Sequence, residues 1–196
     1  IFGNSVKKKQ DENTKFNPRS AYGISKVTGY HLTKNYREAY GIFACSGILY
    51  NHESPRRNKN FVTRKITHNL AKIYRNKKHK IFLGNINSKR DWGHAKDYVV
   101  AMWKMLQQNK PQDFVIGTGK LHSVKDFLKI AFKYLGLDYR KFIVIDKKFY
   151  RKNDKYILRA NINKAVKILK WKPKINFKSI VNEMVINDIN LVYKKS

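Results

Sequence analysis

The sequence predicts an α/β fold with a parallel or mixed sheet. Short apolar runs alternate with segments of helical spacing along the whole chain, which is the pattern of strands joined by helical crossovers. Apolar residues make up 42% of the 196 residues, enough to bury a core. No internal repeat or low-complexity linker interrupts the pattern. The length fits one domain, or a part of a larger protein.

A long helix is expected first, over residues 22–41. Ser20 is suited to the N-cap, and Gly41 stands where a glycine often ends a helix. The run IFACSGILY (42–50) is then typical of a strand that is covered on both faces. The polar segment 51–60 would be a loop at the carboxyl end of that strand, where open α/β sheets place their ligand sites.

Five further helices and three further strands follow from the same reasoning. Ser123 and Asp126 form the start of a capping box for a helix that Gly136 closes, and Asn161 is the expected cap of the helix NKAVKILKW. The other helices are expected over 61–75, 94–108 and 175–193, and the strands over 79–84, 113–117 and 142–146.

The charge of the chain is extreme, with a net charge of +30 and a pI near 10.2. A binder of nucleic acid is therefore one hypothesis. However, 33 of the 43 basic residues are lysine and they are scattered through every segment, whereas a dedicated binder gathers its cations and uses arginine for bidentate contacts. We interpret most of the charge as solvated surface, with weak polyanion binding left open at 7–9, 72–80 and 155–174.

The remaining bulk features point to a globular protein. There is no apolar run of the ~18 residues that a membrane helix needs and no signal-peptide apolar region, so we expect a cytoplasmic protein. Cys45 has no partner for an internal disulfide, and its apolar neighbours indicate a small buried side chain rather than redox or metal chemistry. The chain begins at Ile1 with IFG, which resembles the tail of an apolar strand, so a fragment is expected.

Tyr22 and Lys26 form the most suggestive pair in the sequence. Residues four apart on a helix share one face, so both side chains can point into one cleft. A phenol has an ordinary pKa near ~10, and a nearby ammonium group lowers the pKa by favouring the phenolate. Such a base suits the oxidation of an alcohol whose hydride passes to a nicotinamide. The alternative is an exposed surface pair, because YxxxK often occurs by chance.

Longer strings make the context specific. The segments 35–67, 83–103 and 113–127, which include NHESPRR and KRDWGHAKDY, closely resemble the GDP-mannose 4,6-dehydratase family of the extended short-chain dehydrogenases/reductases. The resemblance covers most of residues 1–150 and, more loosely, the remainder. It implies the C-terminal part of an NAD(P)-binding Rossmann-like fold with a small α/β substrate-binding domain.

The resemblance also implies roles for individual residues. Tyr22 would be the base that takes the proton of the sugar C4 hydroxyl, and Lys26 would hold the cofactor ribose and lower the tyrosine pKa. The other cofactor contacts would be His52 and Arg57. The substrate contacts would be Asn51, Val62, Lys65, Arg90, Arg151 and Asp154.

Several of these residues have ordinary explanations when they are considered alone. His52 is then a solvated loop histidine, and Arg57 belongs to a surface charge run with Arg56. Asp91 would form a local ion pair with Arg90 that caps the following helix, and we favour that reading for Asp91. Trp92, Met102 and Trp103 are expected to pack in the core or cleft wall. Asp154 replaces a family glutamate and is one methylene shorter, which puts nucleotide specificity in question.

The expected domains are a remnant of the dinucleotide-binding domain over 1–60 and a mainly sugar-nucleotide-binding region over 61–196, from which some strands and helices return to the Rossmann-like sheet. The glycine-rich turn of a Rossmann half is not found, since GTGK (117–120) lies far from the amino terminus and lacks the third glycine. The resemblance places that turn, and the glutamate that removes the C5 proton, before Ile1.

The resemblance thus implies a lyase that converts GDP-mannose to GDP-4-keto-6-deoxy-mannose and water with NADP, of which this chain would be a fragment that is inactive or nearly inactive alone. The expected partners are GDP-mannose and further copies of the chain in a dimer or tetramer, without membrane contact and with nucleic acid disfavoured. The alternatives are a related reductase or epimerase and, from another class, a basic nucleic-acid-binding or non-catalytic interaction module.

Overall fold

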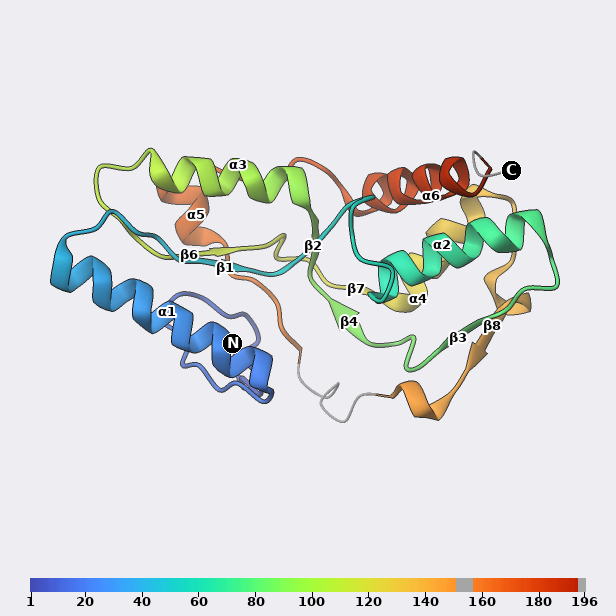
Figure 1. Ribbon diagram of the computed structural model, residues 1–196, viewed down its shortest axis with the longest axis horizontal. Coiled ribbons are helices and arrows are strands. Elements are labelled where there is room, and N and C mark those ends of the chain that lie inside the picture. The colour runs from blue at the N-terminus through green and yellow to red at the C-terminus, as the bar shows by residue number, and fades with distance from the viewer. Residues whose placement is uncertain (151–156, 194–196) are drawn as a thin grey trace. The chain divides into compact units, whose positions relative to one another are not determined.

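The computed structural model describes residues 1–150 and 157–193 (Figure 1). The described residues divide into two compact units. The first contains residues 1–52, 90–121 and 157–174, and the second contains residues 53–89, 122–150 and 175–193. Each unit is therefore assembled from segments that are distant in the sequence.

The first unit contains the long helix α1, Ala21–Tyr40, as the sequence predicted. Ser20 has extended backbone angles, and its Oγ accepts a hydrogen bond from the backbone N–H of Gly23 at 3.1 Å. Gly41 ends the helix with φ 64°, a left-handed conformation that a glycine adopts without steric cost. The caps that the sequence contains therefore set both ends of α1.

Two parallel strands form the centre of the first unit. β1, Gly47–Leu49, pairs with β6, Phe114–Ile116, so that Ile48 lies opposite Val115. The strand predicted over 42–50 is thus too long, because only its last part pairs with a neighbour. Ile42 and Phe43, which were expected to be covered on both faces, are 48% and 42% exposed.

Helices cover both faces of this strand pair. α3, Ala95–Leu106, and α5, Asn163–Ile168, lie on one side of β1 and β6, and α1 lies on the other (Figure 1). On the α3 side the buried core consists of Tyr98, Ala101, Met105, Phe114, Ile116, Ala165, Leu169 and Trp171. On the α1 side it consists of Phe2, Ile48, Tyr50, Val115 and Ala160, with Tyr30 of α1 packed against it. The alternation of β6 side chains between the two clusters follows from the pleat of a strand.

Several local predictions in the first unit are corrected. Ile162, not Asn161, is the N-cap of α5, and Asn161 instead accepts a hydrogen bond from the backbone N–H of Asn163 through its side-chain oxygen. Trp92 is buried, but Trp103 is 61% exposed and Met102 is also exposed, so those two do not pack in the core. Cys45 is half-buried rather than buried.

The second unit is built on three helices, namely α2, Val62–Arg75, α4, Val124–Tyr134, and α6, Phe177–Tyr193. All three pack against one another. The predicted capping box is present, because Ser123 Oγ accepts from the backbone N–H of Asp126 while the Asp126 carboxylate accepts from that of Ser123. Gly136 follows the helix with φ 66°, as its position suggested. The core side chains include Ile66, Leu70, Ile73, Phe127, Leu128, Phe132, Ile180 and Met184.

β3, Ile81–Leu83, and β8, Ile143–Ile145, form a parallel pair in the second unit. Both lie within strands that the sequence predicted, and together with β1 and β6 they confirm the α/β class with parallel pairing. Sequence patterns missed the shortest elements, which are β2, Asn51–Glu53, β4, Lys89–Arg90, β5, Trp92–His94, β7, His122–Ser123, and the 3-10 turns at Tyr139–Lys141 and Lys147–Phe149. Within the ranges described, no helix combines the length and apolarity needed to cross a membrane.

Candidate active site

A pocket of about 710 Å³ lies in the first unit between α1 and β1. This volume is in the range of ligand pockets. Tyr22, Lys26, Asn51, His52 and Arg90 all line it. The fold therefore brings together five of the residues to which the family resemblance gave roles, from three separate segments of the chain.

Tyr22 and Lys26 present one face of α1 to the pocket. Because Ser20 caps the helix, Tyr22 lies in its first turn and Lys26 one turn further on. The Lys26 Nζ lies 5.3 Å from the centroid of the Tyr22 ring. Tyr22 is 72% exposed, so its hydroxyl is accessible to a ligand in the pocket. An accessible phenol beside an ammonium group is an arrangement that can accept a proton from a bound alcohol.

Tyr50 also lines the pocket, but its hydroxyl is already engaged in a hydrogen bond within the protein. The phenol is buried and donates a hydrogen bond to Gln10 Oε1 at 2.8 Å. Burial, followed by the nearby carboxylates of Asp91 and Asp11, raises the pKa of Tyr50 far above its ordinary value. Tyr50 therefore stays protonated, which leaves Tyr22 as the better candidate base of the two.

His52 follows β1 in the segment that the sequence predicted to be a ligand loop, although residues 51–53 form the short strand β2. Its Nδ1 lies 2.9 Å from the backbone carbonyl oxygen of Tyr50. A carbonyl can only accept, so Nδ1 carries the proton in the neutral ring and Nε2 is left as an acceptor. The ring also packs 5.4 Å from that of Tyr98, and these two contacts fix its orientation.

Asp91 has a role that the sequence reading did not anticipate. It is fully buried, and it accepts hydrogen bonds from the backbone N–H groups of Thr118 at 2.8 Å and Gly119 at 2.8 Å, from the Thr118 hydroxyl at 2.6 Å, and from the backbone N–H of Ala160 at 3.1 Å. His94 is the N-cap of the following helix α3, so the interpretation of Asp91 as its cap was wrong. Instead, Asp91 joins three segments of the first unit directly beside Arg90, a residue of the pocket lining.

The close approach of these segments depends on a glycine. A Cβ atom built on Gly117 would lie 2.4 Å from the Cβ of Ala160, closer than two carbon atoms can pack. Gly117 and Gly119 belong to the GTGK string, the nearest match to a glycine-rich turn. In the structure this string follows β6 and receives a carboxylate, Asp91, at its backbone N–H groups.

Three other predicted residues belong to the second unit. Arg57 stacks on Phe61, with its guanidinium carbon 3.6 Å from the ring centroid, and its Nε lies 3.5 Å from the buried Glu53 carboxylate. Val62 is the first residue of α2. Lys65 donates a hydrogen bond to the backbone carbonyl of Phe82 at 2.7 Å, and burial together with the charge of Lys148 lowers its pKa. Arg151 and Asp154 lie outside the described residues.

Solved structures show which class of fold this is. The chain matches RMD from Pseudomonas aeruginosa complexed with NADPH with a TM-score of 0.86 and 16% sequence identity, over 96% of this chain and 63% of that one. It matches dTDP-glucose 4,6-dehydratase from Bacillus anthracis in complex with NAD with a TM-score of 0.80 and 20% identity, over 100% and 59% of the two chains. The fold is that of the extended short-chain dehydrogenases/reductases, as the sequence predicted.

Sequence comparison defines the family within that class. A sequence model of the GDP-mannose 4,6 dehydratase family matches residues 1–184. GDP-mannose 4,6 dehydratase 1 of Arabidopsis thaliana is 49% identical over 195 residues, which are 100% of this chain and 54% of that protein. The human GDP-mannose 4,6 dehydratase is 44% identical over 209 residues, which are 98% of this chain and 56% of that protein. The chain belongs to the GDP-mannose 4,6 dehydratase family, and it spans about half the length of these relatives.

Proposed function

We propose that this chain supplies the catalytic base and part of the nucleotide-sugar site of a GDP-mannose 4,6-dehydratase, a lyase that forms GDP-4-keto-6-deoxy-mannose and water. The observation that carries the proposal is that Tyr22 and Lys26 line one pocket in a chain that matches the family over residues 1–184. The 196 residues alone are expected to be inactive, as the sequence already suggested.

Tyr22 is the proposed proton acceptor. In its phenolate form Tyr22 takes the proton of the sugar C4 hydroxyl and becomes the neutral phenol, and the positive charge of Lys26 stabilises the phenolate beforehand. A bound nicotinamide cofactor would supply the hydride chemistry, an oxidation at C4 balanced by a reduction at C6, so that no net oxidation would result. The cofactor is proposed to be NADP, and Lys26, His52 and Arg57 are its proposed contacts.

The pocket suits part of such a cofactor. Apolar side chains, among them Ile48 and Leu49, line it beside the polar groups of Asn51 and His52 and the cation of Arg90. A flat nicotinamide or ribose packs against apolar walls, while convergent polar groups fix its orientation. The two solved structures with the same fold contain NADPH and NAD, which supports a nicotinamide cofactor but does not choose between the two.

Six residues are the proposed substrate contacts. Asn51 and Arg90 lie in the first unit and Val62 and Lys65 in the second; Arg151 and Asp154 complete the proposed set. Residues 1–60 are proposed as the part that belongs to the dinucleotide-binding domain and residues 61–196 as mainly the sugar-nucleotide part. The inclusion of 90–121 and 157–174 in the first unit supports the return of later segments to the Rossmann-like sheet.

The test is a chimera in which this chain replaces the matching half of the Arabidopsis protein. We expect the chimera to convert GDP-mannose to a 4-keto-6-deoxy product without net change in NADP. Mass spectrometry and NMR identify the product. Net oxidation of NADPH would instead identify a reductase. A hexose that is altered without loss of water would identify an epimerase. Binding of NADP, measured by fluorescence, shows that the chimera has folded.

A second copy of the chain is the proposed partner of α1. Gly23 is the sole buried residue of α1 in the described structure, while Ile24, Leu32, Tyr36 and Tyr40 are each more than half exposed. Such a series of apolar side chains on one helix is typical of an interface. We expect the chain to sediment as a dimer or tetramer, and Leu32→Glu to shift it toward monomer. A monomeric unmodified chain would contradict the proposal.

A further inference from the structure

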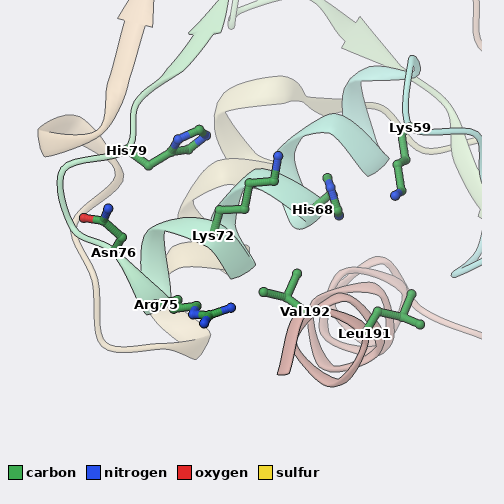
Figure 2. A pocket seen from close by; sticks show the side chains of 8 residues that line it. All are labelled: Lys59, His68, Lys72, Arg75, Asn76, His79, Leu191 and Val192. Atoms are coloured by element: carbon green, nitrogen blue, oxygen red, sulfur yellow. The ribbon is translucent and has the colours of Figure 1, made fainter. Parts of the chain in front are cut away.

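A second pocket, of about 640 Å³, lies wholly within the second unit (Figure 2). His68, Lys72 and Arg75 of α2 line it together with Lys59, which precedes that helix, and Leu191 and Val192 of α6. None of these residues is among those to which the family resemblance gave a role. The pocket shares only His79 with the smaller pocket beside Lys65, and no residue with the pocket of the first unit.

The helix geometry concentrates basic groups here. Residues 68, 72 and 75 are separated by four and three positions, so they lie along one face of α2. Lysine and arginine are common in the last turn of a helix because they complement its dipole. That reason does not explain Lys59, which precedes α2 and nevertheless lines the same pocket.

The positive charges of this pocket are not balanced. No aspartate or glutamate is found among its lining residues, and the side chains of Lys59, Lys72 and Arg75 make no ion pair or hydrogen bond with the residues that the structure describes. By contrast, Arg64 on the same helix pairs with the buried Asp188, with its guanidinium 2.7 Å from the carboxylate. Unpaired cations that converge on a concavity form a site for an anion.

His68 gives a second, independent indication. Its Nδ1 is buried and has no hydrogen-bond partner in the described part of the chain. Burial lowers the pKa of His68, and the charges of Lys59, Lys72 and Arg64 lower it further, against the opposing charge of Asp188 on α6. A buried polar nitrogen without a partner is costly, and an anion in the pocket would provide a compensating charge and, once the ring turns toward it, an acceptor.

We propose that this pocket binds the phosphate group of a small phosphorylated molecule, with Lys59, Lys72 and Arg75 around the phosphate and His68 donating to it. Three charge-assisted donors match the several acceptor oxygens of a phosphate group. Leu191 and Val192 form an apolar wall on which the organic part of the ligand packs. The size of this concavity favours a molecule of nucleotide size over a polyanion, which would follow an extended basic stripe.

The test uses the 196-residue chain with inorganic phosphate and adenosine 5′-monophosphate as probes, in calorimetric titrations at constant ionic strength. We expect both probes to bind, the monophosphate more tightly because of the apolar wall. The double variant Lys72→Gln, Arg75→Gln should weaken binding by about tenfold or more. Lys133→Gln, which removes an exposed lysine from the last turn of α4, should leave binding unchanged.

NMR of the histidine rings provides a readout specific to the pocket. Phosphate should raise the apparent pKa of His68, because it adds negative charge near the imidazole. The charged groups that already shift the pKa of His68 are Lys59, Lys72, Arg64 and Asp188. Far-UV circular dichroism shows that the variants are folded, and the substituted side chains are exposed.

Three results would overturn the proposal. One is phosphate binding that the double variant leaves unaffected or that Lys133→Gln weakens equally. The second is phosphate binding that Lys65→Gln abolishes, because Lys65 lines the neighbouring pocket. The third is binding of a single-stranded oligonucleotide through Lys72 and Arg75 without any binding of the two small probes. None of these outcomes bears on Tyr22 or on dehydratase activity.

Discussion

Arg37 and Asp113 connect the last turn of α1 to the start of β6 by a bidentate ion pair. The two terminal nitrogens of Arg37 each lie 2.9 Å from one carboxylate oxygen of Asp113. Arg37 also donates to the carbonyl of Ala44, and Asp113 accepts from the backbone N–H of Ser46. The pair therefore holds the helix that carries Tyr22 against the strand pair behind the pocket.

Asp113→Asn is predicted to destabilise the chain in a pH-dependent way. Burial acts to raise the pKa of Asp113, but the hydrogen bonds from Arg37 and Ser46 outweigh it and hold the pKa below the ordinary 3.8. A carboxylate whose pKa is depressed on folding stabilises the fold above the pKa of the unfolded chain, and this contribution is lost as the pH falls through the folded value. We expect a loss of about 2 kcal/mol at pH 7 that shrinks below about pH 4.

Urea unfolding at pH 7 and at a pH below about 4 measures this effect. Asp138→Asn is the control, because Asp138 pairs with Arg140, whose side chain is 77% exposed, and exposed pairs contribute little. An equal loss of stability from Asp113→Asn at neutral and acid pH would show that the charge of Asp113 is not what stabilises the contact.

The buried pair of Arg64 and Asp188 should dominate the stability of the second unit. Asp188 is fully buried and accepts from Arg64 Nε at 2.8 Å and from the Thr67 hydroxyl at 2.6 Å. Asp188→Ala leaves a buried guanidinium without a compensating charge, so we expect a loss of about 3–5 kcal/mol in the free energy of unfolding. The double variant Arg64→Met, Asp188→Leu removes both charges and should recover most of the lost free energy of unfolding.

Denaturant unfolding of Arg64→Met, of Asp188→Leu and of the double variant forms the double-mutant cycle. Arg64 also donates to the backbone carbonyls of Pro55 and Arg57, so some of the loss is expected to remain in the double variant. Additive effects of the two substitutions would mean that the pair is not coupled, contrary to its geometry.

Asp91→Ala is predicted to loosen the loop that follows β6. The carboxylate accepts from the backbone N–H groups of Thr118, Gly119 and Ala160. Without it these three amides lose their acceptor, and their hydrogen-exchange protection should fall by about tenfold or more. The amides of α4 in the second unit serve as internal controls. Unchanged protection at the three amides would contradict the role assigned to Asp91.

The sequence predicted those parts of the fold whose signals are local. Ser20 and Gly41 mark the ends of α1, and the capping box at Ser123 marks the start of α4, because caps satisfy backbone groups within a few residues. The start of the strand at Gly47 was not predictable, since its pairing with β6 joins residues 67 positions apart, such as Gly47 and Phe114.

The site was predictable to a similar degree. The i, i+4 spacing of Tyr22 and Lys26 implies a shared face, and the structure places both in one pocket. The role of Asp91 depends on Thr118, Gly119 and Ala160, which no local pattern connects to it. The same reason applies to the basic pocket of the second unit, where Lys59 and α6 meet residues of α2 only through tertiary packing.

Tyr22 is the centre of the proposed chemistry, so its substitution tests the account most directly. The measurement is the rate of GDP-mannose turnover by the chimera with Tyr22→Phe, and the control is Tyr36→Phe, which removes a hydroxyl from an exposed tyrosine of the same helix. Binding of NADP should be retained in both. We predict that Tyr22→Phe lowers kcat by about 10²–10⁴-fold while Tyr36→Phe leaves it unchanged, and an unaltered kcat in Tyr22→Phe would contradict the account.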